Sequence, residues 1–265
     1  MDDKLAQLKK YCDSNHNIQL AFVFGSSVRG RAGEDSDLDV GVHLRDAGKD
    51  EEIWTDVSRL VEQEVDLVVL NDAPATLVSN ILKTGLPLVI KDRNLYWSLY
   101  LGKTLEAEDF AEFTESYWKI YQRSRSFAPE DKTRLIERVQ FLESEFREIT
   151  EFETLRYAEY LEEKVKRRNI ERWVENVVNA TVDIAKIILA SEKKEVPKTY
   201  EQALLNFGLL TGLDERMAVR LSSFARLRNI LAHQYLDITF DRIKNFMKDS
   251  PPVYSVLLGF LHTRI

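Results

Sequence analysis

The chain has 265 residues, with 37 Lys or Arg against 44 Asp or Glu and a formal net charge of −7. This balance argues against a basic coat that would bind nucleic acid over the whole surface. The single cysteine, Cys12, cannot form an internal disulfide, and no run reaches the ~18 consecutive apolar residues of a membrane span. The charged residues 1–10 also lack the apolar centre of a secretory signal. We therefore expect a soluble cytoplasmic protein with no membrane partner.

The two parts of the sequence differ in charge and in glycine content. Residues 1–127 carry 15 basic and 22 acidic side chains, whereas residues 128–265 carry 22 of each. Seven of the ten glycines also precede residue 103. We expect two domains, over residues 1–127 and 128–265, because Pro129 follows a short linker and suits the first turn of a new helix.

The first part alternates predicted strands with predicted helices. Short apolar or alternating runs indicate strands, and apolar side chains at helical spacing indicate helices. The strands are expected over residues 19–24, 37–44, 65–70 and 86–90, and the helices over residues 50–63 and 74–84. Pro87 places the last strand at a sheet edge, since proline cannot donate a ladder hydrogen bond. The pattern predicts an α/β (α+β) domain with a small mixed sheet.

From about residue 94 onward the pattern is helical. Phe110, Phe113 and Tyr117 lie at helical spacing, as do the apolar residues between Ile170 and Ile188. Thr199 with Gln202 three residues later resembles a capping box at the start of a further helix. We expect the second domain to be an all-α helical bundle.

Three aspartates are the first candidates for chemistry. Asp37 and Asp39 occupy alternate positions of a predicted strand, so they share a face with Cα atoms about 7 Å apart. Asp66 lies early in another apolar strand, where a buried unpaired carboxylate would be destabilising. Two neighbouring carboxylates repel each other unless a divalent cation such as Mg²⁺ binds both. The spacing favours a metal site, and the alternative is a surface loop whose acids are merely solvated.

The turn before these aspartates contains Gly25, Ser26 and Ser27 at the end of a predicted strand. Its backbone N–H groups and hydroxyls can hold phosphate oxygens. Arg29 adds positive charge nearby. The groups needed for metal-assisted nucleotidyl transfer are therefore present in this part of the sequence.

Gly25-Ser26, followed after ten residues by Asp37-Leu38-Asp39, resembles the signature of the polymerase-β-like nucleotidyltransferase superfamily. The surrounding residues are similar to its small prokaryotic branch, the minimal nucleotidyltransferases, over about residues 15–92. The resemblance implies that catalysis uses Asp37, Asp39 and Asp66, which together bind two Mg²⁺ ions. It further implies that Asp66 helps to deprotonate the attacking hydroxyl. The triphosphate of ATP would be held by Gly25, Ser26, Ser27 and Arg29.

A second group of candidates lies in the segment from Arg228 to Tyr235. On a regular helix Arg228 and Tyr235 share a face, whereas Arg228 and His233 are about 140° apart. Arg228 and His233 would act together only if the helix ends near His233 or if a second copy of the chain completes the site. The alternative is a helix end whose histidine interacts with the helix dipole.

Arginine, four residues, histidine, one residue and tyrosine resemble the motif of HEPN domains, a helical family rich in ribonucleases. The residues before it, such as Pro197-Lys198-Thr199-Tyr200, are similar to the toxin branch encoded beside minimal nucleotidyltransferases. The resemblance covers about residues 130–248. It implies that Arg228 and His233 cleave RNA without a metal across a homodimer interface. It also implies that Tyr235 receives AMP from the nucleotidyltransferase, which silences the ribonuclease.

Three functions remain open at this point. The leading hypothesis is a fused toxin–antitoxin protein that transfers AMP from ATP to Tyr235 of its own or a neighbouring HEPN domain. A second hypothesis is a nucleotidyltransferase for small molecules, similar to the aminoglycoside enzymes, in which the acidic first domain would suit cationic substrates. The third is a ribonuclease or RNA-binding module that nucleotide binding regulates.

Overall fold

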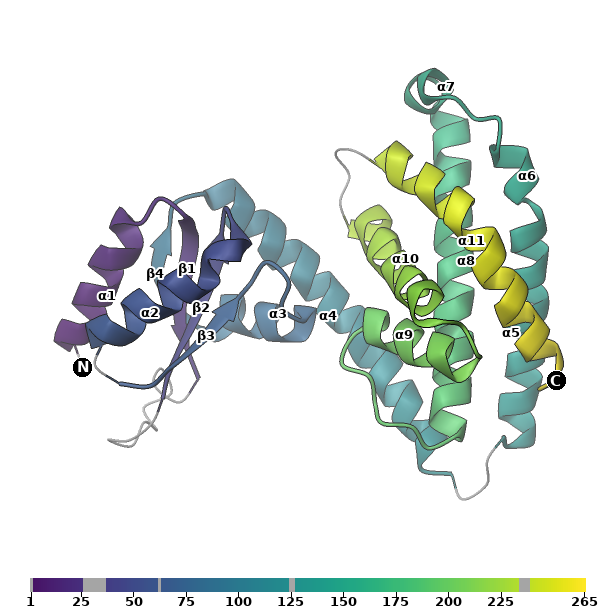
Figure 1. Cartoon of the computed structure of the whole chain (residues 1–265), viewed down its shortest axis with the longest axis horizontal. Coiled ribbons are helices and arrows are strands. Elements are labelled where there is room, and N and C mark those ends of the chain that lie inside the picture. The colour runs from purple at the N-terminus through teal and green to yellow at the C-terminus, as the bar shows by residue number, and fades with distance from the viewer. Residues whose placement is uncertain (1, 26–36, 62, 124–126, 234–238) are drawn as a thin grey trace. The chain divides into compact units, whose positions relative to one another are not determined.

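The computed structural model describes residues 2–25, 37–61, 63–123, 127–233 and 239–265. The chain divides into two compact units, Met1–Glu108 and Asp109–Ile265 (Figure 1). Ser26, Ser27, Arg29 and Tyr235, which the sequence singled out, lie outside the described residues.

The first unit is built on a mixed four-stranded sheet, as predicted. Its elements are α1 (Asp2–Ser14), β1 (Ile18–Phe24), β2 (Leu38–Leu44), the 3₁₀ helix η1 (Ala47–Lys49), α2 (Asp50–Val61), β3 (Val65–Val69), α3 (Ala75–Thr84), β4 (Leu86–Ile90) and the first part of α4 (Arg93–Tyr121). The strand order is β3-β2-β1-β4. β1 is antiparallel to both β2 and β4, whereas β2 and β3 run parallel. β4 is therefore an edge strand, as Pro87 predicted.

Helices cover both faces of this sheet (Figure 1). On one face, apolar side chains of α1 and α2 such as Leu8 and Val57 pack with Val40 and Val42 of β2. On the other face, α3 and the start of α4 pack against the alternate residues of β1, among them Phe22. The strict alternation of β2 therefore turns Asp39 away from the α1–α2 core, toward the α3–α4 face.

The second unit is helical throughout its described residues. After the end of α4 it contains α5 (Pro129–Arg147), α6 (Ile149–Phe152), α7 (Tyr157–Glu162), α8 (Lys164–Ser191), α9 (Tyr200–Leu210), α10 (Glu215–His233) and α11 (Thr239–His262). The predicted apolar stripe of α8, from Ile170 to Ile188, is buried in the core of the unit. The Thr199 hydroxyl accepts a hydrogen bond from Gln202 N at 3.1 Å and caps α9, as predicted.

The boundary between the compact units lies inside α4. Phe110, Phe113 and Tyr117 are buried in the core of the second unit, although they precede the linker that the sequence indicated near Pro129. The structural boundary at Glu108 and Asp109 thus differs from the expected one at residues 127 and 128. The reason is that one continuous helix supplies side chains to two separate cores.

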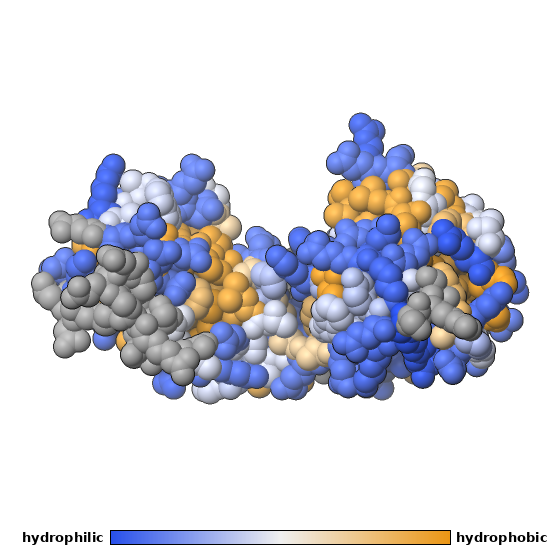
Figure 2. Space-filling model, turned by 90° about the horizontal axis from the view of Figure 1, so that it is seen from below, coloured by the Kyte–Doolittle hydropathy of each residue, from blue (hydrophilic) through white to orange (hydrophobic). Residues whose placement is uncertain are grey.

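Several large apolar side chains remain on the surface, where Figure 2 shows orange areas within a mostly blue surface. Trp97, Leu101 and Leu105 are four residues apart on α4 and are 50%, 59% and 51% exposed. In the part of the chain that the structure describes, no helix combines the length and hydrophobicity needed to cross a membrane.

Candidate functional site

The aspartates of the first unit lie at one end of the sheet. Asp39 is the second residue of β2 and is the register partner of Asp66 in the parallel strand β3. On its other side, Asp39 pairs with Phe24, the last residue of β1. Because neighbouring strands are about 4.8 Å apart, the register brings Asp39 and Asp66 side by side on two strands.

Gly25 packs directly against the Asp39 carboxylate. It follows β1 with a φ of +75°, a conformation that favours glycine. A Cβ atom at this position would lie 1.8 Å from Oδ2 of Asp39, which is far inside van der Waals contact. The turn predicted to hold phosphate therefore begins beside a predicted metal ligand, and a side chain at position 25 would force the Asp39 carboxylate to move.

The three aspartates differ in exposure. Asp37, which precedes β2, and Asp66 are exposed, and Asp39 is half-buried. The expectation that Asp66 is buried is wrong, because β3 is the edge strand next to β2 and buries little beyond Val65. The aspartate is solvated, so its position in an apolar strand does not by itself require a cation.

The side chains of the described residues do not form a ready metal-binding group of three or more His, Cys, Asp or Glu. The donor chemistry nevertheless fits Mg²⁺, because Asp39 and Asp66 present hard carboxylate oxygens from neighbouring strands. The phosphates of a nucleotide supply further oxygen ligands in sites of this kind.

The second set of candidates is carried by α10. Arg228 and His233 both belong to this helix, whose described residues extend to His233. The sequence allowed Arg228 and His233 to act together if the helix ends near His233, and residues 234–238, which would decide this, lie outside the described residues. The side chain of His233 lies outside the described atoms, so the structure gives the place of the histidine but not its contacts.

The Arg228 guanidinium is held by polar side chains from other helices. Its Nε donates to Oδ1 of Asn179 at 2.8 Å, and its Nη1 donates to Oδ2 of Asp109 at 2.6 Å. The ring of Tyr200 lies 5.3 Å from the guanidinium carbon, within reach of a cation–π contact. Burial, together with the negative charge of Asp109, raises the pKa of the Tyr200 hydroxyl, so Tyr200 remains protonated.

These side chains line a cavity of about 280 Å³ within the second unit. Its wall contains two cationic groups, Arg228 and Lys186, together with acidic and aromatic residues. The sequence pointed to Arg228 but missed Asp109 and Asn179, which are 119 and 49 residues away from it. No local pattern connects residues so far apart, and only the folded bundle brings them together.

His43 shares a sheet face with Asp39 but does not join its site. Four residues along a strand correspond to about 13 Å, so His43 lies toward the opposite end of β2. Its Nδ1 is buried without a hydrogen-bond partner among the described residues, and burial lowers the pKa of the imidazole. A neutral, structurally placed histidine accounts for these properties.

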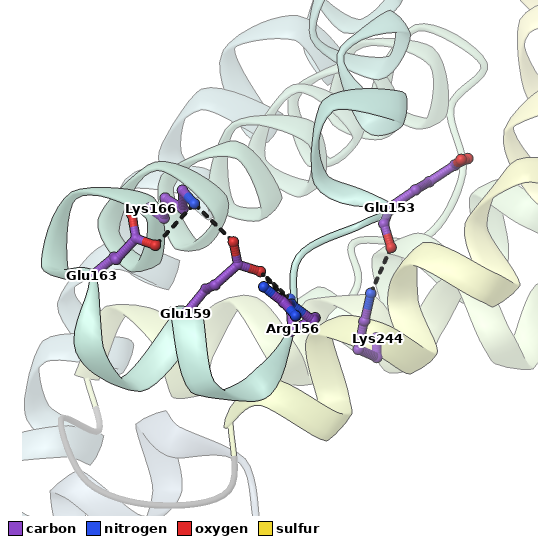
Figure 3. A network of polar contacts seen from close by, with 6 residues as sticks. All are labelled: Glu153, Arg156, Glu159, Glu163, Lys166 and Lys244. Atoms are coloured by element: carbon purple, nitrogen blue, oxygen red, sulfur yellow. Dashed lines mark hydrogen bonds and ion pairs between the residues drawn. The ribbon is translucent and has the colours of Figure 1, made fainter.

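The basic run Lys164–Arg168 is partly neutralised by its neighbours (Figure 3). Lys166 Nζ donates to carboxylate oxygens of Glu159 and Glu163, both at 2.9 Å. Both hydrogen bonds raise the pKa of Lys166. The bond to Glu159, together with bonds from Arg156, lowers the pKa of Glu159 to about 2. The run therefore has the character of a solvated helix surface more than of a free phosphate-binding patch.

The sheet with its paired aspartates and the helical bundle around Arg228 define a nucleotidyltransferase-type domain joined to a helical domain. Family models agree with this division. Residues 6–94 match the family described as Polymerase beta, Nucleotidyltransferase, and residues 142–258 match the family described as Ribonuclease HepT-like. The chain therefore combines a nucleotidyltransferase domain with a HepT-like domain, and both resemblances stated from the sequence are confirmed.

Solved structures with similarity to this chain include a toxin–antitoxin with AMP-PNP, 24% identical with a TM-score of 0.34. That alignment covers 42% of this chain and 93% of the other. Another is a tri-AMPylated Shewanella oneidensis HEPN toxin in complex with MNT antitoxin, 21% identical with a TM-score of 0.32, covering 42% and 92% of the two chains. The comparison with curated proteins returned no match.

Proposed function

We propose that the first domain is a Mg²⁺-dependent nucleotidyltransferase that transfers AMP from ATP to the hydroxyl of Tyr235, in the same chain or in a neighbouring copy. The observation that carries this proposal is the register of Asp39 with Asp66, directly beside Gly25. The match of residues 6–94 to a nucleotidyltransferase family supports the class of reaction. The acceptor rests on the motif that extends from Arg228 to Tyr235.

In this reaction the Tyr235 oxygen attacks the α-phosphate of ATP. A bond forms between the tyrosine oxygen and phosphorus, and the bond to the β-phosphate oxygen breaks, so pyrophosphate leaves. The phenol proton passes to a carboxylate, for which we propose Asp66. Mg²⁺ held by Asp37, Asp39 and Asp66 would supply charge neutralisation for the phosphates. Gly25, Ser26, Ser27 and Arg29 would hold the triphosphate, with backbone N–H groups as donors.

Incubation with ATP and MgCl₂, followed by intact-mass and peptide mass spectrometry, tests the proposal. We expect one or more AMP units on the peptide that contains Tyr235, and none in Asp39→Asn. Asp72→Asn is the matched control, because Asp72 is an exposed aspartate beyond the opposite end of β3. An unmodified Tyr235 in wild type, together with drug-dependent pyrophosphate release that Tyr235→Phe retains, would instead establish a small-molecule transferase.

We further propose that the helical domain is a ribonuclease that AMP transfer silences. The favouring observation is that Arg228 lines a cavity and belongs to the same helix, α10, as His233. In this mechanism His233 assists proton transfer, and Arg228 stabilises the charge of the pentacoordinate phosphate.

We also propose that two copies of the chain pair through this domain. Light scattering, which measures the mass of the particle in solution, tests this.

RNA cleavage is best measured in Asp39→Asn, which the proposed transfer cannot modify. We expect cleavage in this background to disappear on adding either Arg228→Ala or His233→Ala. RNA degradation that persists in both double variants would exclude Arg228 and His233 as the ribonuclease site. Treating the wild-type chain with ATP should lower its cleavage rate, whereas the Asp39→Asn background should not respond.

A further inference from the structure

Arg228 is held more firmly than an ordinary surface arginine. Its side chain is only 15% exposed. Three hydrogen bonds reach acceptors on Asn179, Asp109 and the adjacent Asn229, the last at 3.2 Å. An arginine has five N–H donors, of which Nε and Nη1 carry three. The described contacts therefore engage Nε and Nη1 and leave the two donors of Nη2 for a ligand.

Asp109 is the charged member of this set. Its bond to Nη1, at 2.6 Å, is a charge-assisted one, the strongest kind of hydrogen bond available to an arginine. The Tyr200 hydroxyl also hydrogen-bonds the Asp109 carboxylate, and the Tyr200 ring lies against the guanidinium. Asp109 and Tyr200 therefore restrain both the position and the plane of the Arg228 head group.

Asp109 comes from a different part of the chain than the rest of the site. Arg228, Asn179 and Tyr200 all fall within residues 142–258, which match the HepT-like family. Asp109 lies outside that match, on α4, a helix that begins in the first unit. The charge that faces Arg228 is thus supplied by the helix that is common to both units.

We infer that Asp109 is a positioning residue for the proposed ribonuclease: by binding Nη1 of Arg228 it orients Nη2 to receive the scissile phosphate of RNA. This inference rests on the proposed ribonuclease function. Asp109 touches neither substrate nor reacting atoms and acts only through Arg228. Loss of the carboxylate should therefore lower kcat, whereas KM should change little because the binding surface is otherwise intact.

RNA cleavage by the full chain in the Asp39→Asn background provides the first test. We expect Asp109→Ala to lower kcat about 100-fold with KM within about threefold, the order of effect that misplacement of a catalytic group produces. Asp109→Asn keeps an acceptor oxygen and should recover part of the loss. Glu112→Ala is the matched control, since Glu112 lies on the same helix and lines the same cavity without a described contact to Arg228.

A merely structural role predicts a different outcome. If Asp109→Ala cleaves RNA like Glu112→Ala, or loses activity only in proportion to its folded fraction by circular dichroism, the inference is overturned. If Asp109→Ala does not fold, the comparison of Asp109→Asn with the Glu112 variant decides in the same way.

The ¹H–¹⁵N resonance of Arg228 Nη1, the nitrogen that donates to Asp109, separates this inference from the proposed function. Arg228→Lys identifies the signal by its loss. We expect Asp109→Asn to shift it and to speed its exchange with water about tenfold or more, as a weakened hydrogen bond permits, with no change in Glu112→Ala. If the Asp39→Asn chain does not cleave RNA, only the proposed ribonuclease function is refuted. An unchanged Arg228 resonance in Asp109→Asn would refute the positioning role.

Discussion

Gly25 lies so close to the Asp39 carboxylate that a Cβ at position 25 would displace it. We predict that Gly25→Ala abolishes AMP transfer, because the new Cβ would overlap Oδ2 of Asp39 and displace a proposed metal ligand. The backbone strain of a non-glycine residue at this φ adds about 1–2 kcal/mol. Nucleotide-dependent labelling of the chain measures the activity, and thermal unfolding measures the strain.

Gly212→Ala provides the control for this prediction. Gly212 also has a positive φ, of +85°, but no atom lies within 4 Å of the position of its missing Cβ. It should therefore show a comparable loss of stability and normal AMP transfer. Equal labelling in both variants would mean that Gly25 serves only the backbone conformation.

His43 should make the stability of the first unit depend on pH. Burial lowers the pKa of its imidazole below the value of about 6.5 in an unfolded chain. The unfolded state therefore binds the proton more readily, so stability is highest above that value and falls as pH decreases toward the folded-state pKa. The slope is at most about 1.4 kcal/mol per pH unit for one group.

Urea unfolding at several pH values between about 5 and 8 measures this effect. We expect His43→Leu to reduce the loss of stability toward low pH, and we expect the exposed His16→Gln to leave it as in the wild type. An identical pH profile for the wild type and His43→Leu would contradict the prediction.

At the scale of single residues, alternation was enough to predict which side chains share a sheet face. It placed Asp39 on the face opposite Val40 and Val42, as observed. That Asp66 lies beside Asp39 could not be predicted, because the sequence pattern does not specify which strands pair. The partner of Arg228 was beyond prediction, since Asp109 is 119 residues away.

At the scale of elements, the start of α9 illustrates how a local sequence pattern fixes a helix. The Thr199 hydroxyl caps the helix, and Gln202 Oε1 accepts from Lys198 N at 2.7 Å. The reciprocal bond of the expected capping box thus reaches one residue further back. Since Tyr200, which lies against Arg228, is the first residue of α9, this cap also helps to place a wall of the cavity.

We predict that Thr199→Ala lowers the free energy of unfolding by about 1 kcal/mol, the usual contribution of an N-cap side chain. Thr199→Ser retains the hydroxyl and should lose much less. The midpoint of thermal unfolding, followed by circular dichroism, distinguishes them. Equal destabilisation by alanine and serine would show that the methyl group, and not the cap, is what matters at this position.

Helix α1 was not expected from the sequence, whereas the strands and the helices α2 and α3 of the first unit were predictable because each carries its own periodicity. It was not predictable that α4 extends from the first unit into the core of the second. Its apolar residues continue at helical spacing through Phe110, Phe113 and Tyr117, and spacing alone cannot tell which core receives them. Composition placed the division at the proline-marked linker, whereas packing places it earlier, inside the helix.

At the scale of the whole molecule, this division predicts which fragments fold. A fragment of residues 109–265 keeps Phe110, Phe113 and Tyr117, and we expect it to unfold cooperatively. A fragment of residues 128–265 lacks these buried aromatics, each of which contributes about 3–5 kcal/mol by truncation to alanine. Their combined loss is comparable to the whole stability of a domain, about 5–15 kcal/mol.

Near-ultraviolet circular dichroism during heating tests this expectation. The longer fragment should keep fixed aromatic signals and a sharp transition, and the shorter one should lack both. Two fragments with the same unfolding midpoint would show that the end of α4 is dispensable for the helical core.

The continuity of α4 also affects where proteases can cut the folded protein. Proteolytic enzymes cut most readily at exposed, flexible segments, and at residues 108 and 109 they would meet the interior of a helix. Cleavage at this junction requires that part of α4 first unwinds, close to Phe110 and Phe113, which are buried in the core of the second unit. We therefore expect limited proteolysis of the folded chain to cut at other sites before it separates the two units between residues 108 and 109.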